Sequence, residues 1–169
     1  YGKGGGGAGG INYGVAVVNG GTVFSKAGDI TIAAVGGTGG NFNYGFRLNN
    51  ASITADGYAN ITISGTGGAG TSPGDFYIGT PTSLIGGPAA TGMITFRADK
   101  ISSFTDVTVQ TQGSIRFLPR TPGTSIGISG GSCGGSCTLQ ITDAALGMLN
   151  PDSDGNGIGS LIIGDAAAG

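Results

Sequence analysis

The chain has 169 residues, of which 39 are Gly, and it carries a formal net charge of −2 with no His, no Trp and no Glu. Without His, the Ser–His, Cys–His and zinc–His chemistries of enzymes are excluded. Without a clustered basic surface, a nucleic-acid partner is not expected. No apolar run approaches the roughly 20 residues that a membrane-spanning helix needs, so no membrane span is expected.

Short segments of alternating apolar and polar residues follow one another along the chain, and each predicts a β-strand. They fall into groups of three, separated by turns rich in Gly, Asn, Ser and Pro. The predicted strands are residues 13–18, 22–25 and 29–35, then 44–48, 51–54 and 60–64, then 75–78, 83–85 and 93–98, then 101–105, 107–111 and 114–118, and finally 125–128, 138–142 and 161–163. One helical turn is predicted over 143–149, with Asp143 as its N-cap.

The sequence repeats itself with an offset of 31 residues. The tripeptide Asn-Tyr-Gly at 12–14 recurs at 43–45, and Ile-Thr-Ile at 30–32 recurs at 61–63. The predicted organisation is one domain, 1–169, with repeat units at approximately 5–35, 36–66, 67–99, 100–120 and 121–169.

A single unit of this size has too little apolar surface to bury its own inward face, so the units are expected to stack on one another. The predicted fold class is all-β, a parallel β-helix or β-solenoid of about five three-strand coils. This prediction requires Ile30 and Ile61 to lie on adjoining rungs. It also predicts stacked rings for Tyr13 and Tyr44, and amide ladders that pair Asn12 with Asn43 and Asn19 with Asn50.

The repeat motifs Asn-Tyr-Gly-Val, Asn-Gly-Gly-Thr-Val and Gly-Asp-Ile-Thr-Ile, with the C-terminal segments 122–128, 139–146 and 160–164, resemble those of filamentous-haemagglutinin-like large exoproteins. The resemblance covers most of the chain, more loosely over 70–120. It implies a right-handed β-helix that is secreted or displayed on the bacterial cell surface, often within a very long adhesin or matrix protein. The family offers no catalytic residues to transfer.

The two cysteines, Cys133 and Cys137, depart from that pattern. No His and no second Cys pair is present to complete a zinc site. In an exported protein the expectation is a disulfide that closes a small loop. Free thiols and an interchain bond are the alternatives.

An Asp-rich turn near the C-terminus is the one stretch with metal chemistry. Its spacing, followed by Gly157, matches the start of a calcium loop, and Ca²⁺ takes six to eight hard oxygen ligands. The candidate ligands are Asp152, Asp154, Asn156, Ile158 and Asp165. Ile163 occupies the twelfth position, where such a loop supplies a bidentate acid, and Asp165 falls two residues late. The two interpretations are a structural Ca²⁺ site and a β-turn that needs no ion.

These observations favour an extracellular structural or adhesive β-helix without catalytic residues, acting as a stalk segment or as a filament subunit that associates end to end. A cell-surface or matrix ligand is a possible partner. One alternative is a β-helical polysaccharide lyase, which would need Asp residues gathered with basic side chains on one outer face. The basic candidates are Arg47, Arg97, Lys100 and Arg116. Another alternative is an ice- or surface-binding module with a flat array of outward Thr.

Overall fold

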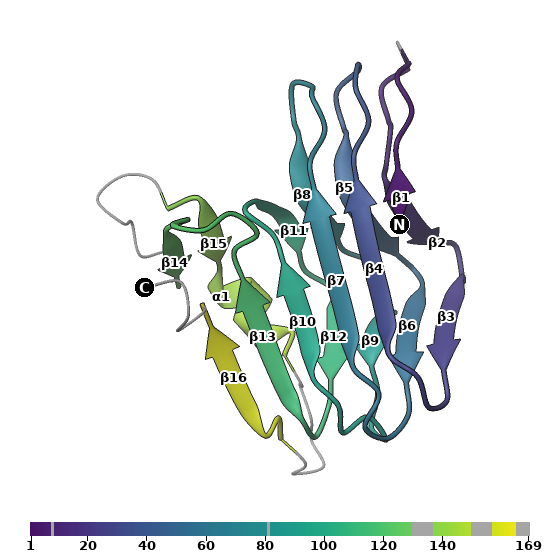
Figure 1. Cartoon of the computed structure of the whole chain (residues 1–169), viewed down its shortest axis with the longest axis vertical. Coiled ribbons are helices and arrows are strands. Elements are labelled where there is room, and N and C mark those ends of the chain that lie inside the picture. The colour runs from purple at the N-terminus through teal and green to yellow at the C-terminus, as the bar shows by residue number, and fades with distance from the viewer. Residues whose placement is uncertain (8, 81, 130–136, 150–156, 165–169) are drawn as a thin grey trace.

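The computed structural model describes residues 1–7, 9–80, 82–129, 137–149 and 157–164. The fold is nearly all-β, with parallel strands in stacked sheets as in a parallel β-helix, and the predicted fold class is therefore confirmed (Figure 1). Three sheets run side by side along the stack, and successive strands of the chain visit them in turn. We number them sheet 1 to sheet 3.

Sheet 1 contains β1 (Gly2–Lys3), β4 (Ile30–Val35), β7 (Ile61–Thr66), β10 (Ile94–Arg97), β13 (Ser114–Leu118) and β16 (Ser160–Ile163). Sheet 2 contains β2 (Val15–Val18), β5 (Tyr44–Asn49), β8 (Gly74–Ile78) and β11 (Ile101–Phe104). Sheet 3 contains β3 (Thr22–Ser25), β6 (Ser52–Ala55), β9 (Ser83–Gly86) and β12 (Val107–Gln110).

The register of sheet 1 confirms the stacking that the repeat predicts. Ile30 pairs with Ile61, and Ile61 pairs in turn with Ile94. The column continues from Ile94 to Ile115. Because neighbouring strands of a sheet lie about 4.8 Å apart, each inward side chain contacts its equivalents one coil before and one coil after.

Phenylalanine rings fill the interior between sheets 1 and 2. Phe46 meets Phe76 edge to face at 6.2 Å between ring centroids, and Phe76 meets Phe96 at 6.3 Å. Phe96 also stacks on Phe117 at 5.1 Å, with 22° between the ring planes. These four rings are at most 1% exposed, so they form a continuous apolar column through the coils.

Within sheet 1 the 31-residue offset holds between β4 and β7 and then changes. Ile61 pairs with Ile94, 33 positions on, whereas Ile94 pairs with Ile115, only 21 positions on. The inward columns stay in register because the turns between the strands absorb the differences in length. Burial thus fixes the register of the strands and leaves the turns free to vary.

The C-terminal unit departs from the three-sheet pattern. β14 (Ile126–Ile128) and β15 (Leu139–Ile141) pair with each other, and only β16 joins one of the three sheets. The predicted helix is present as α1 (Asp143–Gly147), but the assignment of its cap was wrong. Thr142 is the N-cap, and its hydroxyl accepts a hydrogen bond from the Ala145 N–H at 3.1 Å.

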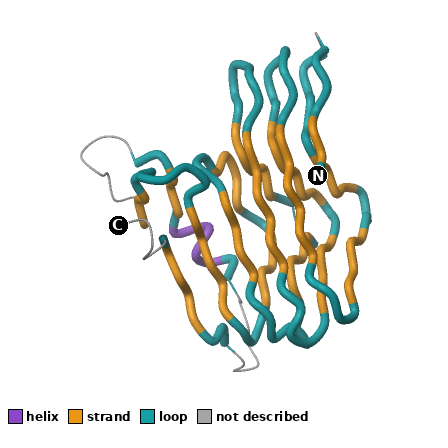
Figure 2. Tube along the Cα trace, viewed as in Figure 1, coloured by secondary structure: helices purple, strands orange, loops and turns teal. Residues whose placement is uncertain are grey.

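Three glycine-rich loops project together beyond the sheets, as Figures 1 and 2 show. We call them the wing: residues 4–7 with 9–12, residues 36–43, and residues 67–73. Backbone hydrogen bonds join successive loops, from Gly37 N–H to the Asn12 carbonyl (2.9 Å) and from Gly68 N–H to the Asn43 carbonyl (2.8 Å). A Cβ on Gly68 would collide with the Gly37 carbonyl, so the close stacking of the loops requires glycine.

The two predicted asparagine ladders differ in outcome. The Asn12 amide donates to the Asn43 side-chain oxygen at 3.2 Å, and Asn43 is fully buried at the base of the wing. Asn19 and Asn50 instead occupy left-handed turn positions, with φ of 54° and 48°. Within the described residues no hydrogen bond joins their side chains, and the Asn50 side chain accepts one from Thr82. The turn geometry explains the repetition of this second pair.

Candidate functional site

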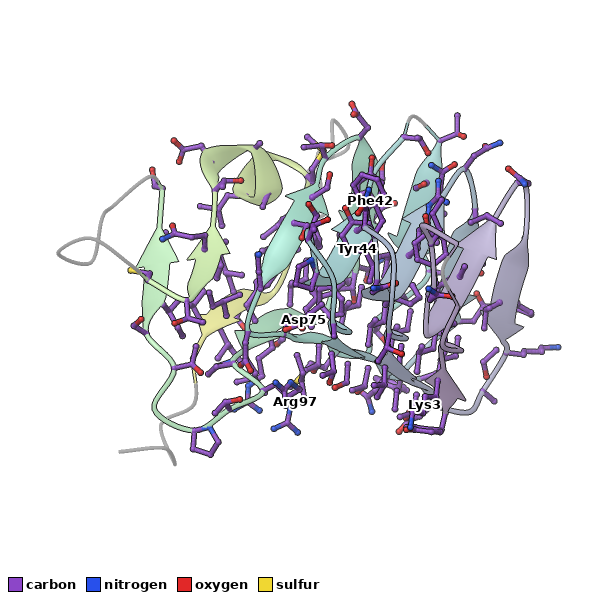
Figure 3. All side chains as sticks on the ribbon, turned by 90° about the horizontal axis from the view of Figure 1, so that it is seen from above. Lys3, Phe42, Tyr44, Asp75 and Arg97 are labelled. Carbon is purple, nitrogen blue, oxygen red and sulfur yellow. The ribbon has the colours of Figure 1, made fainter. Side chains whose placement is uncertain are left out.

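Aromatic side chains from three successive coils gather with one arginine where the chain passes from the wing into sheet 2. We call this group the tyrosine cluster. Its members are Tyr13, Phe42, Tyr44, Arg47 and Tyr77. They line a cavity of about 180 Å³ on the outside of the solenoid. Figure 3 shows Phe42 and Tyr44 on one side of the molecule and Arg97 on the opposite side, beyond sheet 1.

The rings of the cluster contact one another in sequence along the stack. Tyr13 and Tyr44 lie one coil apart and are stacked, with ring centroids 6.0 Å apart and 10° between their planes. The predicted stacking of these two rings is confirmed. Tyr44 also contacts Tyr77 at 5.1 Å and Phe42 at 6.1 Å, both tilted. Tyr44 is only 7% exposed, whereas Phe42 is 44% exposed at the rim.

Arg47 supplies the charge of the cluster. Its guanidinium carbon lies 5.0 Å from the Tyr13 ring centroid and 5.8 Å from that of Tyr77, within the range of a cation–π contact. Its Nη1 donates a hydrogen bond to the Tyr13 hydroxyl at 2.9 Å. Its Nε is buried without an acceptor, and none of the described carboxylates lies within salt-bridge distance of it. The guanidinium therefore keeps unused donors beside exposed ring surface.

The surroundings of Tyr44 favour its neutral form. Burial raises the pKa of Tyr44, and the nearby Tyr77 and Tyr13 raise it further, while Arg47 acts in the opposite direction. The hydroxyl of Tyr44 consequently stays protonated over the physiological range. The cluster then presents polar hydroxyls, apolar ring surface and one positive charge.

The basic residues that a lyase would need are divided between two sheets and a turn. Arg97 and Arg116 lie on paired strands of sheet 1 and share its outer side, whereas Arg47 lies in sheet 2 and Lys100 lies in the turn between β10 and β11. The four side chains therefore do not form one cluster.

Two aspartates near that turn serve the backbone. Asp75 accepts hydrogen bonds from the N–H groups of Gly67 (2.6 Å), Asp99 (2.5 Å) and Lys100 (2.9 Å). Asp99 accepts from the N–H groups of Arg120 and Thr121 and forms an ion pair with Arg120 at 2.8 Å. Each carboxylate therefore fixes a turn of the following coil.

The pKa of Asp99 reflects these contacts. Burial acts to raise it, but hydrogen bonds from the Thr121 side chain and backbone and from the Arg120 N–H, together with the charge of Arg120, lower it on balance. The folded state therefore favours the ionised carboxylate.

The predicted calcium ligands fall mainly outside the described residues. Asp152, Asp154, Asn156 and Asp165 all lie there, so the calcium site stays a prediction. Ile158 is described and packs against the core with an aliphatic side chain. Across the described ranges, no group of three or more Asp, Glu, His or Cys side chains is arranged to hold a metal.

The predicted disulfide also stays a prediction, because Cys133 lies outside the described residues. Cys137 lies two residues before the start of β15 and is 8% exposed. No cysteine of the described part is free.

Sequence reasoning found Tyr13 and Tyr44 but missed the participation of Phe42, Arg47 and Tyr77 in one cluster. The 31-residue offset predicts Asp75 as the partner of Tyr44. In the structure Arg47 pairs with Tyr77, 30 positions on, and Tyr44 pairs with Gly74. An alignment of the inward residues Phe46 and Phe76 would have supplied the offset of 30.

None of the helices in the described ranges combines the length and the apolar character needed to cross a membrane. In comparisons with known proteins, no family model, no curated protein and no solved structure matched the chain.

Proposed function

We propose that the chain is an extracellular structural or adhesive β-helix, either a stalk segment of a large exoprotein or a subunit that associates end to end. Such a stack of coils would behave as a stiff rod. Hydrogen bonds between parallel strands run along the stack, and inward columns hold successive coils in register. Deforming such a stack requires many of these contacts to break together.

The main support for the proposal is the uncovered edge of the first coil. In the described structure β2 and β3 each pair on one side only. The inward residues Val15, Val17 and Val23 are half-buried there. Their equivalents in the next coil, Phe46, Leu48 and Ile53, are fully buried. A further coil, from the same polypeptide or from another copy, would cover these side chains and pair both strand edges.

The resemblance to filamentous-haemagglutinin-like repeats supports placing this rod outside the cell. So does the scarcity of charge and of catalytic groups in the sequence. Adhesion would then be carried by outer side chains, because the inward ones are committed to the core.

End-to-end association can be tested with one matched pair of substitutions on β3. Val23 points inward and is half-buried, whereas its neighbour Phe24 is 56% exposed. Light scattering and electron microscopy over a range of concentrations should reveal elongated particles for the unmodified chain. Val23→Lys should suppress them, because a lysine at the open column must be desolvated when a coil is added. Phe24→Lys should not. Compact monomers that cleave a polysaccharide would refute the structural proposal.

One observation favours the ice- or surface-binding alternative. Thr31, Thr62 and Thr95 pair in register on sheet 1. The column ends at the next coil, where Thr95 pairs with Arg116. We therefore rank this function second, and an ice-recrystallisation assay tests it directly.

A further inference from the structure

We propose that the tyrosine cluster binds an acidic saccharide, with one pyranose ring against the aromatic side chains and the anionic group of that sugar on Arg47. This inference deepens the adhesive part of the proposed function, because it names the class of ligand that the solenoid would hold. It does not depend on end-to-end association. It stands on the ring surfaces, the unused donors of Arg47 and the size of the cavity.

The rings supply the surface that a sugar needs. One face of a pyranose is lined with C–H groups, and the negative face of an aromatic ring attracts such weakly positive hydrogens. Phe42 offers exposed ring surface at the rim, and Tyr77 lines the cavity in contact with the buried Tyr44 ring. The tyrosine hydroxyls add polar groups of the kind that orient a ligand.

Arg47 selects for charge. The planar guanidinium matches the two oxygens of a carboxylate or a sulfate and forms charge-assisted hydrogen bonds with them. Among the described residues, Arg47 makes one side-chain hydrogen bond, to Tyr13, and no carboxylate there neutralises its charge. A neutral sugar would leave the positive charge of Arg47 uncompensated, so the site favours an acidic sugar.

The size of the cavity limits what enters. Its volume of about 180 Å³ is below the range of about 300–1,000 Å³ that is typical of sites for drug-sized ligands. One sugar ring fits that space, and the remaining units of an oligosaccharide would lie along the outer surface. Modest affinity is therefore expected for a single site, and repeated sites on a fibre would raise it through avidity.

The test is a titration of the folded chain with three trisaccharides: a galacturonic acid trimer, a neutral galactose trimer and a sulfated galactose trimer. Binding is followed by calorimetry and by tyrosine fluorescence, since the chain has no Trp. We expect the uronate to bind at least 10-fold more tightly than the neutral trimer. Binding of the sulfated trimer at equal strength would show that either anion satisfies Arg47, and its absence would restrict the site to carboxylates.

Variants separate this site from a merely structural cluster. Arg47→Gln should weaken uronate binding about 10- to 100-fold, as expected for the loss of a charged hydrogen bond, and Arg97→Gln, on the opposite side, should leave it unchanged. Tyr77→Phe keeps the ring but removes one hydroxyl, so it should weaken binding less than Arg47→Gln does. Thermal unfolding verifies that each variant is folded. If Arg47→Gln does not fold, Arg47→Lys replaces it; because lysine keeps the charge but lacks the planar fork, it should bind uronate more weakly than the unmodified chain and still prefer it to the neutral trimer.

Three results would overturn the inference: no binding of any acidic trimer at millimolar concentration, equal binding of acidic and neutral trimers, or equal binding of an acidic peptide. Microscopy of Arg47→Gln separates the two proposals. If fibres persist while saccharide binding is lost, the saccharide site and end-to-end association are independent, and each proposal can fail without the other.

Discussion

Replacement of Phe96 by Ala is the sharpest test of the stacked core. The Phe96 ring is 1% exposed and lies at the centre of the aromatic column. It contacts Phe117 at 5.1 Å, Phe104 at 5.2 Å and Phe76 at 6.3 Å. Truncation of a buried Phe to Ala typically costs about 3–5 kcal/mol. Because three ring contacts are lost together, we expect a value near the upper end, about 4–5 kcal/mol.

The matched control is Phe24→Ala, at a ring that is 56% exposed on β3. A substitution on that surface should cost less than about 1 kcal/mol. Since whole domains are stable by only about 5–15 kcal/mol, Phe96→Ala could unfold the chain. Phe96→Leu, which leaves a smaller cavity, then provides a measurable intermediate.

Urea unfolding followed by far-ultraviolet circular dichroism gives the free energy of unfolding of each variant by linear extrapolation. The expected order of destabilisation is Phe96→Ala, then Phe96→Leu, then Phe24→Ala. Equal costs at positions 96 and 24 would show that Phe96 does not lie inside a packed column, and the stacked arrangement of coils would then be wrong.

Three further predictions concern the turns, the tyrosine cluster and the wing. Because the pKa of Asp99 is lowered on folding, its stabilising contribution is present above the ordinary Asp pKa of about 4 and is lost as pH falls through the folded value. In Asp99→Asn the midpoint of urea unfolding should depend less steeply on pH in this acidic range. An unchanged pH dependence would contradict the role of the Asp99 carboxylate. The raised pKa of Tyr44 implies that its ionisation destabilises the folded chain above about pH 10. Tyr44→Phe should therefore reduce this alkaline loss of stability in urea unfolding, and Tyr58→Phe, at an 88% exposed ring, is the matched control. Gly68→Ala should lower the stability of the chain by about 1–3 kcal/mol in thermal unfolding, because its Cβ would collide with the neighbouring loop. Gly5→Ala meets open space and should be nearly neutral.

The sequence predicts the stacked fold because burial requires apolar residues to recur at regular intervals along the chain. Inward positions must be apolar in every coil, so Ile30 and Ile61 reveal both the strand and its neighbour. This periodicity is harder to recognise where the turns change length. Ile94 and Ile115 occupy the same column as Ile61, but their separation of 21 residues hides that relation from a search with one fixed offset.

The candidate site is harder to predict because it depends on pairing between coils of unequal length. Tyr13 and Tyr44 share a motif and were identified. Arg47 and Tyr77 share no motif, and only the register of β5 and β8 brings them together. The helix cap failed for a local reason, since Thr142 and Asp143 are both good capping residues and the residue pattern does not decide between them.

The location of the tyrosine cluster follows from an interruption in the stack. Tyr13 is followed one coil later by Tyr44, and their rings lie nearly parallel. One coil further, the position that pairs with Tyr44 is Gly74, which has no side chain to continue the column. A Cβ there would already lie 3.3 Å from the Tyr44 ring. Tyr77 therefore meets Tyr44 from the neighbouring column at a tilt of 32°. A third stacked tyrosine in the Tyr13–Tyr44 column would have filled this space, and without it a cavity opens. Arg47 lines the cavity because it pairs with Tyr77 on the next strand.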